Sequence, residues 1–156
     1  MKLKQALRHQ KDRFGFTLIE TVLVVSLFAV LTGLSIPVYY SFQVRNDLVV
    51  ASNNVSQSLK RAQLLSQAVA GDSNWGVHIV KGTLTIYKGP NYIGRDPAYD
   101  ELFDLSNSVT PSLTDVTDVN FAKMTGLPQN TGNIVLTSTS GESKTLIVNS
   151  QGMVSY

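Results

Sequence analysis

An uninterrupted apolar segment near the N-terminus limits what this chain can fold into. Residues 21–44 carry no charge, and Val, Leu, Ile and Phe dominate them. A helix needs about 20 apolar residues to cross a bilayer, so this segment is long enough to span one. An ordinary secretory signal has a shorter apolar core, of about 7–15 residues, that ends in an A-x-A-like cleavage site. The segment therefore predicts an anchor helix that stays on the protein.

Basic residues are concentrated before this segment. The first 15 residues carry a net charge of +4, whereas the whole chain carries +2, so the remaining residues carry −2. Lysine and arginine beside a membrane segment mark its cytoplasmic side, and we expect the N-terminus to lie inside. The slightly acidic remainder offers no basic stripe for nucleic acid, so DNA is not an expected partner.

One carboxylate, Glu20, stands at the start of the apolar segment. A charged side chain in a membrane helix costs roughly 2.5–3.5 kcal/mol and is a functional-site hypothesis by default. No lysine or arginine follows within the segment to pair with it. A cut between Gly15 and Phe16 would create an α-amine four residues before Glu20. Such an amine could pair with the Glu20 of a neighbouring molecule.

The stretch Gly15-Phe16-Thr17-Leu18-Ile19-Glu20, between a short basic leader and a long apolar helix, resembles the processing site of type IV prepilins and pseudopilins. The resemblance implies that a prepilin peptidase cleaves after Gly15 and N-methylates Phe16. It also implies that Glu20 serves filament assembly. The alternative is a generic signal anchor with a chance acid at its edge. The chain has no cysteine, so it lacks the C-terminal disulfide loop of many Gram-negative pilins.

The sequence predicts one helix from about residue 17 to about residue 70, of the order of 80 Å long at ~1.5 Å per residue. Its second half is amphipathic, because apolar residues recur there at steps of three and four. The apolar face comprises Val44, Leu48, Ala51, Val55, Leu59, Ala62, Leu65 and Val69. The polar face comprises Asn53, Asn54, Ser56, Gln57, Lys60, Arg61 and Gln63. Gly71 is the expected C-terminal stop.

Gly33 and Pro37 are expected to weaken the first half of this helix. Pro37 removes one i→i−4 hydrogen bond and crowds the carbonyl of the residue four positions earlier. That residue is Gly33, a poor helix former. The pair predicts a kink or a locally melted turn, and the alternative is a mild bend, which membrane helices tolerate.

The remainder of the chain reads as β-structure. Residues 75–80 and 83–88 flank Lys81-Gly82 and predict a hairpin, and a loop through Gly94-Arg95-Asp96-Pro97 follows it. Further strands are expected at 102–105, 109–114, 116–123, 132–138, 144–149 and 153–156. These strands after one long helix make an α+β fold with an antiparallel sheet. The order and the C-terminal hairpins resemble those of GspH/FimT-type minor pilins and pseudopilins.

These patterns divide the chain into four parts. Residues 1–15 are the expected leader peptide, and residues 16–44 the transmembrane or filament-core helix. Residues 45–70 are the amphipathic helix packed on the sheet, and residues 71–156 the β-rich domain. The resemblance implies the pilin fold for the whole.

Few residues offer chemistry beyond this. His78 is the single histidine after the leader, and without a cysteine or a second histidine a transition-metal site is not expected. Asp96, Asp100, Glu101 and Asp104 cluster in the expected long loop and read as a solvated acidic loop, with a Ca²⁺ site as the alternative. Aromatic residues surround this loop and either close the core or form a subunit contact: Tyr87, Tyr92, Tyr99 and Phe103. No nucleophile motif is present, and neither a cofactor nor enzyme activity is expected.

The expected function is structural: a minor pilin or pseudopilin of a type IV pilus or a type II secretion-like filament. Its expected partners are prepilin peptidase, other pilin subunits through helix packing, the inner-membrane assembly machinery, and membrane lipid before assembly. The expected location is the cytoplasmic membrane first and the cell-surface filament afterwards. The alternative is a DNA-binding pilin of a DNA-uptake pilus, in which Lys81, Lys88 and Arg95 would cluster around one hairpin.

Overall fold

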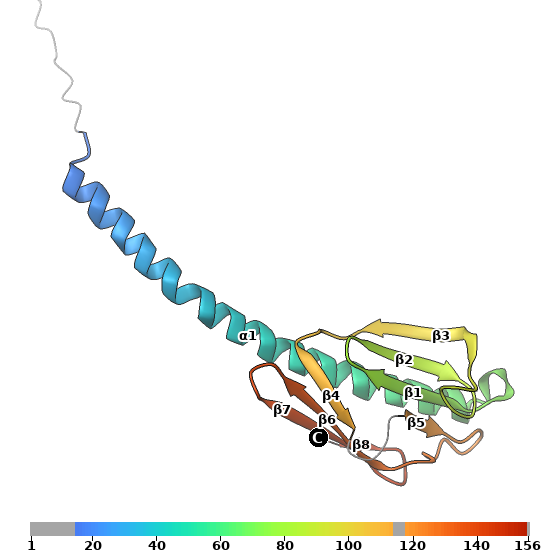
Figure 1. The fold of residues 1–156 in the computed structure, drawn as a ribbon. Coiled ribbons are helices and arrows are strands. Elements are labelled where there is room, and N and C mark those ends of the chain that lie inside the picture. Colours follow the sequence, from blue (N-terminus) through green and yellow to red (C-terminus); the bar gives the residue numbers. More distant parts are fainter. Residues whose placement is uncertain (1–14, 114–117, 156) are drawn as a thin grey trace, which may run out of the picture. The chain divides into compact units, whose positions relative to one another are not determined.

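The computed structural model describes residues 15–113 and 118–155, and the chain divides after Val38 into two units. Of the expected leader, residues 1–14 lie outside the described residues. The described chain forms a helix, α1 (Leu18–Gln67), a short 3-10 helix, η1 (Ala70–Asp72), and eight strands (Figure 1). The α+β fold predicted from the sequence is confirmed: one long N-terminal helix packs, through its C-terminal part, on antiparallel sheet.

Helix α1 ends three residues earlier than the sequence predicts. Val69 already adopts a left-handed conformation with φ of 54°, two residues before Gly71, whose φ is 63°. The carbonyl of Ser66 accepts hydrogen bonds from the backbone N–H of Val69 at 3.1 Å and of Met124 at 3.0 Å. A tertiary contact with the later chain therefore takes a carbonyl that helix continuation would use, and the expected stop at Gly71 comes too late.

The amphipathic pattern in the second half of α1 is confirmed. Six of the predicted apolar residues are buried, and Leu65 packs at the margin of the same core. The six are Val44, Leu48, Ala51, Val55, Leu59 and Ala62. The assignment of Ser56 to the polar face is wrong, because Ser56 is buried together with Ser52, Ser58 and Ser66. The helix has a wider buried face than one sheet would require, because a second sheet also packs on it.

The predicted hairpin is confirmed at the predicted residues. Strands β1 (Trp75–Val80) and β2 (Thr83–Lys88) pair antiparallel through the turn at Lys81-Gly82. Gly82 has a φ of 85°, a conformation that glycine adopts without the strain of a side chain. Strand β5 (Asp118–Phe121) pairs with the other side of β1, and β3 (Asp96–Asp104) with the other side of β2. The order of this first sheet is β3-β2-β1-β5.

Strand β3 corrects the expected loop around residues 94–97. The strand begins at Asp96 and runs to Asp104, whereas the sequence predicts only residues 102–105 as strand. Its acidic residues and Pro97 disfavour a strand by propensity. They are tolerated because β3 is the edge of the sheet, where charge and proline also discourage pairing with another chain. The acidic cluster therefore belongs to an edge strand and not to a solvated loop.

A second four-stranded sheet has the order β4-β6-β7-β8. It comprises β4 (Val109–Leu113), β6 (Gly132–Ser138), β7 (Ser143–Val148) and β8 (Val154–Ser155). All neighbours pair antiparallel. The predicted limits are accurate to about a residue for β6 and β7, whereas the parts of the predicted strands at 114, 116–117 and 156 lie outside the described residues. The sequence does not predict the division into two sheets.

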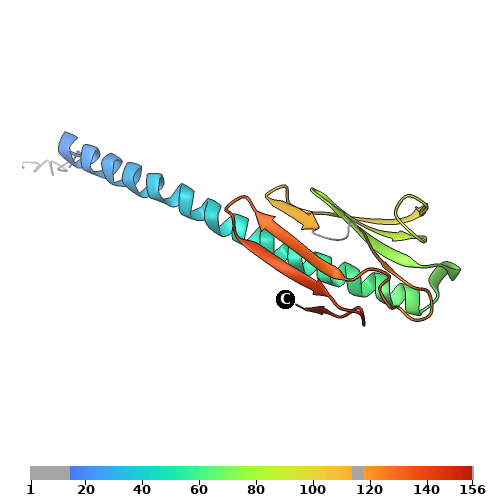
Figure 2. The ribbon, with the colours of Figure 1, turned by 60° about the horizontal axis from the view of Figure 1, so that its bottom comes forward.

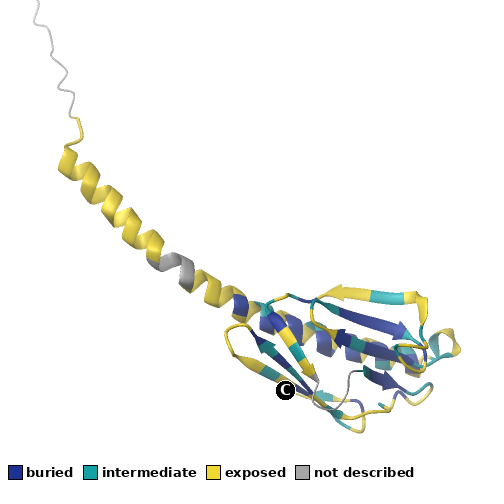
Figure 3. Cartoon of the chain, in the orientation of Figure 1, coloured by how far each residue is buried: buried dark blue, intermediate teal, exposed yellow. Residues whose placement is uncertain are grey.

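The core of the second unit lies between α1 and both sheets (Figure 2). It joins Val55 and Leu59 of the helix to Ile86 of the first sheet and Leu136 and Leu146 of the second, all of them fully buried. Figure 3 shows this buried face of α1 against the strands. Burial of several such side chains, each contributing about 1.5–3 kcal/mol, gives the unit a core of its own without disulfides.

Polar contacts also join the helix to each sheet. Arg45 forms a forked ion pair with Glu142 in the turn between β6 and β7, with a shortest distance of 2.7 Å. Arg61 binds Glu101 of β3 through two hydrogen bonds of 2.7 and 2.8 Å. Asp47 accepts hydrogen bonds of 2.7 Å from the hydroxyls of Ser106 and Ser108. Each of these contacts joins the helix to a residue distant in the chain, at the margin of the apolar core.

Candidate functional site

The residues before α1 form the first part of the candidate site. Gly15, Phe16 and Thr17 precede the helix without regular structure, and the Phe16 side chain is 81% exposed. A Cβ atom built on Gly15 would meet no atom within 4 Å. Packing within the described residues therefore does not require a glycine at this position. If glycine is required, the requirement comes from a partner that binds the Gly15–Phe16 bond.

Thr17 caps the N-terminus of α1, a role that the sequence analysis missed. Its side-chain oxygen accepts a hydrogen bond of 3.3 Å from the backbone N–H of Glu20. Threonine followed three residues later by glutamate is the sequence signature of a capping box, so the pattern was available in the sequence. An acid in the first turn also interacts favourably with the helix dipole. Glu20 therefore has a local role at the helix start besides any role toward a partner.

The described side chains of the apolar segment of α1 are exposed up to Gln43, and only Val44 at its end is buried. Its residues from 18 to 33 are all exposed, including Leu23, Leu27 and Phe28 (Figure 3). The helix contains an 18-residue window with a mean hydropathy of 2.2, none of it buried within the chain. It is compatible with a single membrane span by length and composition. In water, an apolar surface of this size would need a partner or a lipid to cover it.

The hydroxyl groups in this segment are satisfied within the helix. Thr21 donates to the carbonyl of Leu18 at 2.8 Å, Ser26 to that of Leu23 at 2.9 Å, and Thr32 to that of Phe28 at 2.7 Å. An unpaired hydroxyl in an apolar medium costs several kcal/mol. Bonds to the carbonyls three or four residues earlier remove this cost. The segment can thus enter lipid or a helix bundle without an outside hydrogen-bond partner for these three residues.

Glu20 differs from these hydroxyls. It is exposed, and within residues 15–113 and 118–155 no lysine, arginine or histidine forms an ion pair with it. Next to it, Thr21, Val22, Val25, Ser26 and Ala29 line a shallow depression on the helix. The carboxylate of Glu20 therefore stands beside an apolar surface that a second helix could cover.

The helix continues through Gly33 and Pro37. The backbone is α-helical at both residues, so this structure has no melted turn there. A Cβ at Gly33 would meet no described side chain within 4 Å, so packing in the described part of the chain does not require this glycine either. The two units of the chain meet one residue after Pro37. The kink expected at this pair stays a prediction.

His78 lies in β1 within a stack of charged and aromatic groups. Its Nδ1 atom contacts the carboxylate of Asp118, and its ring stacks on Tyr92 with a centroid distance of 3.7 Å. The Arg95 guanidinium lies 3.9 Å from the same Tyr92 ring and is paired with Asp100. Among the described residues, no three histidine, aspartate or glutamate side chains are close enough to hold a metal ion. The arrangement secures the chain between β2 and β3.

The acidic residues of β3 point in different directions. Asp100 pairs with Arg95, whereas Glu101 pairs with Arg61 of the helix. Asp96 accepts a hydrogen bond from the backbone N–H of Ala98 at 3.2 Å. Pairing of two of the acids with arginines separates the cluster that the sequence suggested. These contacts give no support to the Ca²⁺ alternative.

The aromatic residues of this region have separate roles. Tyr87 is fully buried, and burial raises the pKa of its phenol to about 12. The rings of Tyr99 and Trp75 are nearly perpendicular, with a distance of 6.4 Å between their centroids, and the ammonium of Lys88 lies 4.0 Å from the centroid of the Tyr99 ring. Tyr87 therefore closes the core, whereas Tyr92 and Tyr99 hold cations at the surface. The sequence left both roles open.

The structure does not bring together the three cations considered for DNA binding. Lys81 lies in the turn before β2, and Lys88 lies at the opposite end of that strand. At ~3.3 Å per residue, the length of β2 separates them by roughly 20 Å. Arg95 is near the Lys88 end, but its charge is compensated by Asp100. No basic patch forms from these residues.

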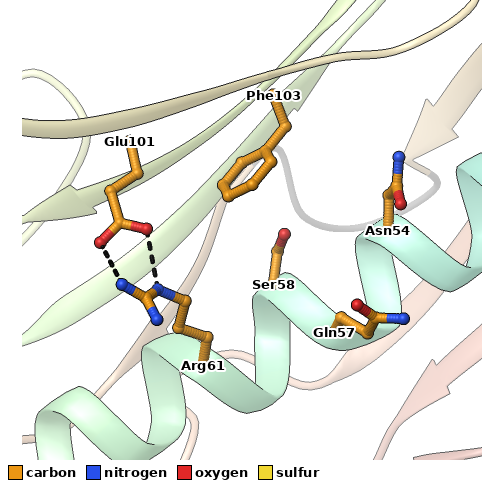
Figure 4. A pocket seen from close by; sticks show the side chains of 6 residues that line it. All are labelled: Asn54, Gln57, Ser58, Arg61, Glu101 and Phe103. Carbon is orange, nitrogen blue, oxygen red and sulfur yellow. Dashed lines mark hydrogen bonds and ion pairs between the residues drawn. The ribbon is translucent and has the colours of Figure 1, made fainter.

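Helix α1 and strand β3 enclose a groove of about 380 Å³ (Figure 4). Asn54, Gln57, Ser58 and Arg61 line it from the helix, and Glu101 and Phe103 from the strand. The Arg61–Glu101 ion pair crosses one end of the groove, and the Phe103 ring covers its wall.

Comparison with known proteins adds no assignment. No protein-family model matches the chain, and no solved structure matches it.

Proposed function

We propose that this chain is a structural subunit of a type IV pilus or of a type II secretion-like filament, made as a precursor and cleaved after Gly15. The observation that carries the proposal is the exposed apolar segment in the first half of α1. It follows an exposed Gly15 and Phe16, and it begins with one carboxylate, Glu20, that forms no ion pair within the described residues. A globular domain alone has no use for such a helix. A filament built from packed helices requires one from every subunit.

The features of the helix suit two successive environments. Before assembly, the apolar segment anchors the subunit in the cytoplasmic membrane, and the basic leader keeps the N-terminus inside. In the filament, the same segment packs against the helices of other subunits. The hydroxyls of Thr21, Ser26 and Thr32 form hydrogen bonds within the helix. These bonds lower the free-energy cost of placing the helix in lipid or in a helix bundle, because neither environment provides water.

Cleavage supplies the missing partner for Glu20. Removal of residues 1–15 leaves the α-amine of Phe16 as a cation at the membrane end of the helix. Within one subunit this amine lies a turn from Glu20 and pairs with it only loosely. A neighbour displaced along the helix axis can bring its amine directly against Glu20 in a medium of low dielectric, where attraction is much stronger than in water. The pair would then set the register between subunits.

The second unit gives the filament its exterior. It has a core between the helix and two sheets, so it folds outside the membrane while the apolar segment remains inside. As a minor subunit or pseudopilin it would present this domain at the surface of the filament. Prepilin peptidase, neighbouring pilins and the inner-membrane assembly machinery are the partners this function requires.

The processing step can be tested by intact-mass analysis of the membrane-purified protein. In cells with an active prepilin peptidase, we expect loss of residues 1–15 and the added mass of one methyl group on Phe16. A Gly15→Val variant should keep its leader and still enter the membrane, because the apolar helix is unchanged. Recovery of the wild-type chain with Met1 intact from such cells would refute the proposal.

A further inference from the structure

The loop between β2 and β3, residues 89–95, is held firmly although it lies at the surface. The Tyr92 ring is in contact with His78 at 3.7 Å and with the Arg95 guanidinium at 3.9 Å. Asn91 accepts a hydrogen bond of 2.7 Å from the backbone N–H of Gly94, and Arg95 donates one of 2.8 Å to the carbonyl of Tyr92. These contacts define a single conformation for the segment, which we call the Ile93 loop.

Ile93 stands at the tip of this loop and is 96% exposed. Single exposed apolar residues are common on protein surfaces. Ile93 differs because the contacts of Tyr92 and Arg95 fix the backbone on both sides of it. A rigid loop loses little conformational entropy when it binds, and such preorganisation raises affinity. The Ile93 loop therefore has the properties of a projecting anchor for a protein contact.

A receiving surface of matching character lies on α1. Lys60, Arg61, Leu64, Leu65 and Ala68, together with Gln57, line a groove of about 510 Å³ on the outer side of the helix. Leu64 in its floor is 64% exposed. This outer groove adjoins the one in Figure 4 through Gln57 and Arg61, which line both. Its apolar floor and cationic margin can take an apolar side chain that has an acid beside it.

The charges that remain available on the two surfaces are opposite. Arg61 and Asp100 are already paired within the chain, with Glu101 and Arg95 respectively. Lys60, one helical turn before Leu64, forms no ion pair within the described residues, and Asp96, three residues after Ile93, forms none there either. An apolar side chain with an acid nearby in the chain is thus available on one surface, and an apolar side chain with a base nearby on the other. Lys60 and Leu64 are neighbours on one face of α1, since residues i and i+4 of a helix lie about 5–6 Å apart.

We propose that the Ile93 loop of one copy of this chain docks into the outer groove of the next copy, with Ile93 against Leu64 and Asp96 beside Lys60. The two surfaces are different patches of one domain, so the contact is heterologous. A heterologous contact that does not close on itself generates an open helical array. The inference rests on the proposed filament function and adds to it the contact between exported domains.

Cysteine cross-linking tests this contact in assembled filaments. The chain contains no cysteine, so introduced pairs report one contact without background. A disulfide needs the two Cα atoms within about 7 Å. The full-length Ile93→Cys/Leu64→Cys variant, oxidised in sheared filaments, should give a ladder of multimers on a non-reducing gel. Each single variant should give no ladder, because one cysteine per chain cannot link more than two copies.

A matched pair, Ile93→Cys with Met153→Cys, controls for chance collisions, since Met153 is 65% exposed and lies outside the groove. A second test uses charge. Lys60→Glu and Asp96→Lys should each lower the yield of the Ile93–Leu64 cross-link several-fold, and their combination should restore it. Both substitutions lie at the surface, so folding is not at risk.

The outcomes separate the two proposals. A ladder for the Ile93–Leu64 pair, absent for the control pair and rescued by the charge exchange, supports the docking. Variants that enter filaments without forming the ladder, or equal ladders for both pairs, overturn the docking and leave the filament function standing. Absence of the wild-type chain from filaments would overturn the filament function and the docking with it.

Discussion

The two halves of α1 share a backbone conformation and differ in what covers them. Between residues 18 and 33 every side chain is exposed, whereas from Val44 onward one face of the helix is buried against strands. The second half is covered by residues of its own chain. The first half has no cover within the described chain, and its apolar surface is understandable only in a medium or an assembly that the chain meets later.

The hydrogen bonds of serine and threonine side chains also differ between the two halves of α1. In the first half, Ser26 bonds to the carbonyl of Leu23 within the helix. In the second half, Ser66 accepts a hydrogen bond of 2.9 Å from the N–H of Trp75 and donates one of 3.1 Å to the carbonyl of Phe121. The Ser66 hydroxyl thus contributes to tertiary structure, whereas Ser52 in the same half donates within the helix, to the carbonyl of Val49 at 2.9 Å. The first half keeps its hydroxyls internal, as a lipid-exposed helix must.

The same substitution placed in each half should have opposite consequences, and this is the largest expected effect. Leu59 is fully buried and Leu27 is 59% exposed. Leu59→Asp places an unpaired charge in the core and should destabilise the second unit by at least about 3–5 kcal/mol. Leu27→Asp should leave the melting temperature of that unit unchanged. Thermal unfolding of the full chain in detergent, followed by circular dichroism, measures both.

Membrane extraction provides the reciprocal readout. Leu27→Asp should weaken retention in the membrane, because a carboxylate in a membrane helix costs roughly 2.5–3.5 kcal/mol, whereas Leu59→Asp should not. Equal melting temperatures for Leu59→Asp and the wild type would show that the packing of helix on sheet is wrong.

Glycines provide a smaller comparison between the same two regions. A Cβ on Gly76 would lie 2.5 Å from the Tyr87 ring, in the core, whereas a Cβ on Gly33 would meet nothing. Gly76→Ala should therefore cost about 1–3 kcal/mol of stability through overpacking. Gly33→Ala should leave that stability unchanged and favour the helix locally by up to about 1 kcal/mol. Chemical denaturation of the full-length variants measures the free energy of unfolding of the second unit. A smaller loss of this free energy for Gly76→Ala than for Gly33→Ala would contradict the assigned packing.

The sequence predicted those features that depend on local pattern. Helical periodicity located the buried face of α1, because Val55 and Leu59 recur at the spacing of one helical face. Alternation and the Lys81-Gly82 turn located the first hairpin to the residue. Both signals come from neighbouring residues, which is why a single sequence contains them.

Features that depend on distant residues were missed. Asp96 and Pro97 read as loop, because nothing local shows that pairing with Lys88 and its neighbours would draw them into an edge strand. The burial of Ser56 depends on chain that packs on the helix from elsewhere in the sequence, and the early end of α1 coincides with the hydrogen bond from the Met124 N–H to the Ser66 carbonyl. At the candidate site the missed cap at Thr17 is different, since its T-x-x-E pattern is local and readable. A group on another molecule that pairs with the Glu20 carboxylate leaves no signal in the sequence of this one chain.

Incorporation of Glu20 variants into filaments tests the central claim most directly. Glu20→Val removes the charge and keeps the apolar helix, so the variant should be cleaved, inserted and folded like the wild type. We expect it to be depleted from sheared filaments and retained in the membrane fraction, because the register contact with the Phe16 amine is lost. Asp104→Asn, which removes an exposed acid that forms no ion pair within the described residues, controls for a general loss of charge and should assemble normally. Normal incorporation of Glu20→Val would contradict the claim and leave apolar helix packing alone to drive assembly.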